Sequence, residues 1–92
     1  MNQIERITRM ELILDEATEA AAALLAALER YQALKPRIDE LEAYYTSSLW
    51  MQDYRDDSAG RLPQRLKRGV LSEEAVYDLL STLTEITKHL KD

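Results

Sequence analysis

Hydrophobic side chains recur along the first third of the chain at alternating intervals of three and four residues. The opposite positions are mostly acidic or polar, and Asn2 with Glu5 matches a capping box that would start a helix. Such spacing brings the apolar residues onto one helix face, as in a coiled coil. The pattern predicts a helix over about the first 34 residues, with a seam formed by Ile7, Met10, Leu14, Ala17, Ala21, Leu24, Leu28 and Tyr31.

The apolar stripe shifts by one position at Pro36. On its far side the stripe continues with Ile38, Leu41 and Tyr45. A proline inside a helix removes a hydrogen bond and costs about 3 kcal/mol, whereas at the first helical position it costs little. We therefore predict a break, with a second helix that starts at Pro36. A kinked continuous helix is the alternative, because no Gly or Asn marks a C-cap before the proline.

Capping residues predict the remaining elements. Ser47 is placed to start a short extra helix over about residues 48–57. Residues 58–71 contain both glycines and the second proline, which indicates a structured loop. Ser72, followed by two glutamates, is the expected N-cap of the last helix. The apolar face of that helix comprises Val76, Leu79, Leu80, Leu83, Ile86 and Leu90.

These elements predict an all-α fold: residues 1–92 as a single helical domain, arranged as an antiparallel bundle of three main helices. The first helix would be about 48 Å long, whereas the last would be about 30 Å long at the same rise per residue. Part of the first seam is therefore expected to lack a partner within the chain. We expect a second copy or another helix to cover it.

Composition restricts the function classes. The 92 residues include two glycines, two prolines and no cysteine, which excludes a Gly-rich nucleotide fold, disulfides and thiolate metal sites. The net charge of −5 disfavours a dedicated nucleic-acid binder. The N-terminus lacks the pattern of a signal peptide, and the longest apolar run, Ala20 to Leu28, is too short to span a bilayer. These features predict a cytoplasmic protein with no membrane contact.

No catalytic or metal-binding constellation is apparent. The serines have capping, turn or surface explanations, and His89 is the only histidine. Glu85, His89 and Asp92 could share a helix face, but a contact between the histidine and the helix dipole explains His89 better. We therefore predict no enzyme activity, no catalytic residues, no metal and no cofactor.

Two clusters could bind a partner. Arg61, Arg65, Lys67 and Arg68 form a basic segment that could meet an anionic ligand or nucleic acid. The alternative, which we favour, is that the upstream aspartates neutralise it. The five aromatic residues Tyr44, Tyr45, Trp50, Tyr54 and Tyr77, with Leu49 beside Trp50, form what we call the aromatic cluster. Its members Tyr44, Leu49, Trp50 and Tyr54 could be a partner surface. The alternative, which we favour, is a small core covered by the 58–71 loop, with Leu49 the most exposed member.

Residues 44 to 80 contain the Tyr44–Tyr45 pair, Trp50, Leu62–Pro63 and the block LKRGVLSEEAVYDLL. These motifs, together with the opening NQIERITRMELILDEA, resemble a family of small bacterial proteins known as domain of unknown function 4298. The resemblance implies a helical bacterial intracellular protein and assigns no activity, ligand or catalytic residue.

The sequence as a whole predicts a non-enzymatic interaction or structural protein, which acts through homo-oligomerisation or a partner helix. The alternative is anion or nucleic-acid binding through residues 61–68.

Overall fold

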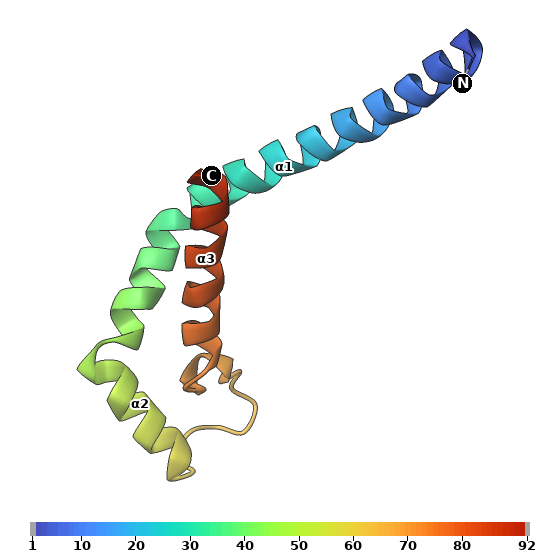
Figure 1. Cartoon of the computed structure of the whole chain (residues 1–92). Helices are drawn as coiled ribbons and strands as arrows, with labels where there is room; N and C mark the ends of the chain where they lie inside the picture. The colour runs from blue at the N-terminus through green and yellow to red at the C-terminus, as the bar shows by residue number, and fades with distance from the viewer. Residues whose placement is uncertain (1, 92) are drawn as a thin grey trace. The chain divides into compact units, whose positions relative to one another are not determined.

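A computed structural model describes residues 2–91 of the chain. In these residues the regular structure is entirely helical, which confirms the predicted all-α class (Figure 1). The elements in chain order are α1 (Gln3–Tyr45), α2 (Ser48–Ser58), the 3-10 turn η1 (Gly69–Leu71) and α3 (Ala75–Lys91).

The start of α1 is fixed by the predicted cap. The backbone N–H of Glu5 donates to Oδ1 of Asn2 over 2.8 Å, and Nδ2 of Asn2 donates to Oε1 of Glu5 over 3.2 Å. The first of these bonds satisfies a backbone donor that a helix end leaves without an intrahelical partner, and the second joins the two side chains. The asparagine therefore starts the helix as the sequence indicated.

The predicted break at Pro36 is wrong. Helix α1 continues through the proline to Tyr45, so the alternative of one continuous helix is correct on this point. The proline has no N–H and so leaves the carbonyl of Gln32 without its helical donor, but residue 32 is exposed, where water can replace the lost bond. Good helix formers on both sides retain the helical backbone.

The chain divides into two compact units, with the boundary between Lys35 and Pro36. In the described part of the first unit, residues 2–35, every residue after Asn2 belongs to α1. The second unit, described for residues 36–91, contains the end of α1 together with α2, η1 and α3. The sequence predicted a single domain. The boundary between the two units coincides with the shift of the apolar stripe at Pro36.

Serine caps start the later helices. Ser47 has extended backbone angles, and its hydroxyl accepts from the N–H of Trp50 at 3.4 Å, so α2 begins where the sequence predicted. The hydroxyl of Ser72 accepts from the N–H groups of Glu74 and Ala75 at 3.2 and 3.3 Å. Between α2 and η1, Gly60 has a positive φ of 73°, a conformation that a residue without Cβ adopts without strain.

The core of the second unit is small and centres on η1. Its buried side chains are those of Trp50, Leu71 and Val76, one each from α2, η1 and α3. Helices α2 and α3 each contact η1, whereas no Cα of α3 comes within 8 Å of the described Cα atoms of α2. The turn therefore links these helices. The first and second helices predicted from the sequence are both parts of α1, so the three main helices of the predicted bundle are not the helices observed.

Candidate functional site

The N-terminal seam, as we call the eight residues predicted above, lies on the first unit. No residue of α1 is buried, and along residues 2–27 every side chain is exposed. Leu14 is 58% exposed and Leu24 is 62% exposed. Within its own unit the seam is the face of a single helix, so this unit by itself offers nothing to cover it.

The apolar surface extends beyond the seam. Ile13 and Leu25, which flank it, are 46% and 57% exposed. Residues 20–28 consist of alanine and leucine alone, so this stretch of the helix surface carries no charge. Contiguous exposed apolar surface of this kind commonly marks an interaction site. Helix geometry places Leu12 on the opposite face from Leu14, although its exposure of 59% is almost the same.

The aromatic cluster of the second unit is largely a core. The ring of Trp50 stacks on Tyr54 at a centroid distance of 5.2 Å and meets Tyr45 edge-on at 5.3 Å. Its indole N–H donates to the carbonyl of Val70 over 2.9 Å, and the residue is only 7% exposed. Trp50 is therefore not an open partner surface, which favours the alternative of a loop-covered core.

The other members of that cluster differ in exposure. Tyr44 and Tyr54 are half-buried, and Leu49 is 61% exposed, as its position suggested. The Tyr44 hydroxyl donates to Oδ2 of Asp53 over 2.6 Å. This hydrogen bond, with burial and the negative charge of the carboxylate, raises the pKa of Tyr44 to about 12. Tyr44 is therefore a neutral donor at physiological pH.

An open groove lies beside the Tyr44–Asp53 pair. Its volume is about 310 Å³, at the low end for sites that bind small molecules. Apart from that pair, the groove is lined by Leu62, Leu66, Lys67, Val70 and Leu71. Its polar groups are few, and Asp53 already accepts the tyrosine hydroxyl. The groove thus offers no convergent set of catalytic groups.

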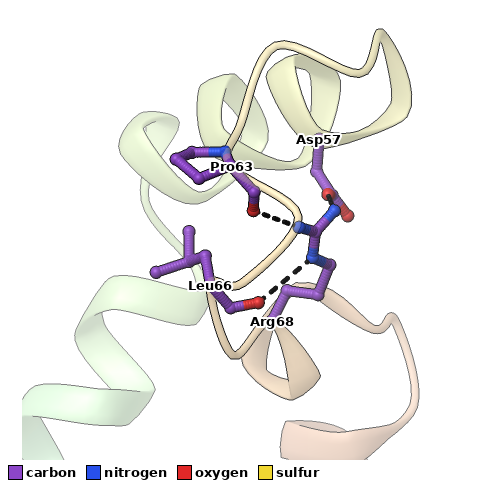
Figure 2. Close-up of polar contacts among 4 residues, drawn as sticks. All are labelled: Asp57, Pro63, Leu66 and Arg68. Atoms are coloured by element: carbon purple, nitrogen blue, oxygen red, sulfur yellow. Dashed lines mark hydrogen bonds and ion pairs between the residues drawn. The ribbon is translucent and has the colours of Figure 1, made fainter.

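Two of the four cations in the basic segment pair with aspartates of the same chain. Arg61 pairs with Asp56 at 3.0 Å, and Arg68 pairs with Asp57 at 2.6 Å. Figure 2 shows that the Arg68 guanidinium also donates to the carbonyls of Pro63 and Leu66. Neutralisation by upstream aspartates, which the sequence indicated as the alternative to anion binding, is therefore found for these two arginines.

The other two cations of the segment, Arg65 and Lys67, are exposed. Anion binding through the segment stays a prediction, with two of its four cations already paired.

Near the C-terminus, Nε2 of His89 lies 3.8 Å from Oε2 of Glu85, and both side chains are exposed. Among residues 2–91 no group of three or more acidic or histidine side chains is placed to hold a metal ion.

Sequence reasoning missed the contacts that bridge distant positions. The Tyr44–Asp53 bond spans nine residues, and the Trp50–Val70 bond spans twenty. Neither follows a helical spacing rule. The one signal available was the clustering of aromatic residues ahead of a loop rich in leucine and valine, which indicated a local core without giving its bonds.

Comparison with known proteins identifies the family. No helix within residues 2–91 combines the length and the hydropathy needed to cross a membrane. Neither the curated proteins nor the solved structures contain a match to the chain. A family model described as "Domain of unknown function (DUF4298)" matches residues 7–92, nearly the whole chain. The chain therefore belongs to the DUF4298 family.

Proposed function

We propose that this protein is a non-enzymatic interaction protein that self-associates through the N-terminal seam of α1. The observation that carries the proposal is the exposure of a regular coiled-coil seam on a helical segment with no core of its own. Isolated helices in water gain little stability without packing of an apolar face. Covering the seam would supply that packing.

A second copy of α1 is the occupant that fits the seam best. From Ile7 to Tyr31 the seam spans 24 residue steps, which is about 36 Å along a helix. A second copy provides a helix of the same length and the same spacing. The other helices of the described chain, α2 with 11 residues and α3 with 17, are too short to cover it.

The charges beside the seam also favour self-association. Positions that flank a coiled-coil seam usually carry charges that select the partner. Here the flanking positions are mostly apolar or uncharged, with Arg6 and Glu11 as the charged exceptions. The face of α1 that carries the seam has no dominant charge, so it does not favour a strongly acidic or strongly basic partner helix. It can pack against the same apolar face of a second copy.

The absence of an enzyme role is part of the proposal. Within the described residues, the groove of the second unit combines the hydrogen-bonded Tyr44–Asp53 pair and Lys67 with a hydrophobic lining. The chain's single histidine lies on the exposed last turn of α3. A nucleophile with an adjacent base, which most hydrolytic mechanisms require, has no counterpart there.

Sedimentation equilibrium of the full chain over a wide concentration range tests the proposal. We expect a mass that is a multiple of the 10.6 kDa chain, with dissociation towards the monomer on dilution. Helix content measured by circular dichroism should fall over the same range, because α1 loses the packing of its apolar face. A monomer with constant helix content at all concentrations would refute self-association.

A further inference from the structure

The apolar face of α1 is wider than the N-terminal seam. In a coiled coil, one row of residues lies beside the seam on each side. We call these rows the flanks of the seam: Arg6, Ile13, Ala20 and Ala27 on one side, and Glu11, Thr18, Leu25 and Gln32 on the other. Each flank carries one large apolar side chain, Ile13 or Leu25, and both are exposed.

The charged residues of this stretch lie mainly on the other side of the helix. Between Ile7 and Tyr31 the chain has seven charged residues, of which Glu11 alone lies on a flank. The six that face away from the seam are Arg9, Asp15, Glu16, Glu19, Glu29 and Arg30. The seam and its flanks therefore form one broad apolar face, and the opposite face is the one suited to water.

A simple pair of helices would leave part of this broad face uncovered. Two paired helices bury their seam positions, whereas the flanking positions lie at the edge of the contact and often carry charges. In a bundle, by contrast, the apolar face of each helix includes a flank as well as the seam. The face of α1 matches a bundle, because Ile13 and Leu25 extend it on both sides of the seam.

The middle of the face would allow close packing on both sides. There, Ala17 and Ala21 of the seam lie beside Ala20 of one flank and Thr18 of the other. The distance between packed helices depends on the size of the side chains at the contact. With four small side chains at this level, neighbouring helices can approach the seam and either flank equally closely.

We propose that at least three copies of this chain assemble through α1 into a helical bundle, in which each copy packs its two flanks against two different neighbours. The inference rests on the self-association proposed above and adds the number of copies. In such a bundle the six charged residues on the opposite face stay in water. Since the second unit follows the seam in every copy, the assembly would carry at least three second units.

Sedimentation equilibrium of the full chain and of a flank variant tests the number of copies. The double variant Ile13→Gln/Leu25→Gln makes both flanks polar and leaves the seam unchanged, and glutamine is a good helix former. We expect at least three times the chain mass of 10.6 kDa for the natural protein, and twice the chain mass or less for the double variant. Leu12→Gln, on the opposite face, is the control and should keep the natural mass. The fluorescence of Trp50, which lies in the second unit, should be unchanged in both variants.

The masses separate the two proposals. A natural protein of twice the chain mass would overturn the bundle and leave self-association intact. A natural protein that is a monomer at every concentration would refute self-association itself. If the natural protein has at least three copies but the double variant keeps that mass, or if Leu12→Gln loses mass to the same extent, packing through the flanks is overturned.

Discussion

The indole N–H of Trp50 donates to the backbone carbonyl of Val70 over 2.9 Å, and this bond joins α2 to η1 across twenty residues of chain. The bond holds the loop between α2 and η1 in place over the aromatic rings. It also satisfies the single polar atom of a side chain that is otherwise buried among apolar groups. The core of the second unit is organised around this contact.

Replacing Trp50 with Phe should destabilise the second unit. The variant loses the hydrogen bond to Val70 and leaves that carbonyl without its donor, and it also removes part of a buried ring, for a total of about 2–3 kcal/mol in the free energy of unfolding. Urea unfolding followed by circular dichroism measures this loss. Leu49→Ala is the control, because that side chain is 61% exposed and should change the unfolding free energy by less than about 0.5 kcal/mol. Equal effects at the two positions would argue against a core centred on Trp50.

Arg68→Lys should destabilise the same unit although the charge is kept. The guanidinium reaches Asp57 and the carbonyls of Pro63 and Leu66 at once, which a lysine ammonium cannot reproduce with the same geometry (Figure 2). We expect a loss of about 1–2 kcal/mol in thermal or urea unfolding. Arg65→Lys makes the identical chemical change at an exposed neighbour and should be neutral. An Arg68→Lys variant as stable as Arg65→Lys would contradict the structural role of Arg68.

The Tyr44–Asp53 bond should make stability depend on alkaline pH. The pKa of Tyr44 is raised from 10.0 to about 12 because its hydroxyl donates to the carboxylate of Asp53. Folding therefore favours the protonated tyrosine, and this contribution is complete below pH 10 and is lost as the pH rises towards 12. At pH 8, Tyr44→Phe should be less stable than the natural protein by about 1 kcal/mol.

That difference should shrink between pH 10 and pH 12, the window set by the raised pKa. Urea unfolding of the two proteins at several pH values measures it. Tyr77→Phe, at a residue that is 62% exposed, should change stability little at pH 8 and is the control for the loss of a tyrosine hydroxyl. A constant difference between the natural protein and Tyr44→Phe across this window would contradict the hydrogen bond.

Pro36→Ala should strengthen α1. The substitution restores the N–H that the carbonyl of Gln32 lacks and removes the ring that crowds the preceding turn. Part of this gain is offset because alanine leaves the unfolded chain more flexible than proline does, so we expect a net stabilisation of about 1–2 kcal/mol. Circular dichroism should show more helix and a higher Tm, whereas Arg37→Ala next to it should change little. A loss of helix in Pro36→Ala would indicate that the proline is needed for the local structure.

Local signals in the sequence predicted local structure well. Asn2, Ser47 and Ser72 were recognised as caps because a cap depends on residues only two or three positions away, and each makes the expected hydrogen bonds. The prediction at Pro36 failed because it considered the cost of a proline inside a helix and left out that an exposed helix tolerates one missing hydrogen bond. The shift of the apolar stripe there was nevertheless informative, since it falls at the boundary between the two units.

The sites were less predictable than the helices. Whether Trp50 is exposed depends on the path of the loop after α2, and that path is held by contacts such as those of Arg68, which follow from no spacing along the chain. The seam of α1 was predictable because its members repeat every three or four residues. Its partner was not, since periodicity gives the face of a helix and not the identity of what covers it.

The seam is tested most directly by the same substitution on its two sides. Leu14 and Leu12 are 58% and 59% exposed within one chain, and Leu14 belongs to the seam whereas Leu12 lies on the opposite face. Sedimentation equilibrium of Leu14→Glu and Leu12→Glu therefore separates association through the seam from general hydrophobicity. We predict that Leu14→Glu is a monomer of reduced helix content and that Leu12→Glu retains the mass of the natural assembly. Equal masses for the two variants would contradict association through the seam.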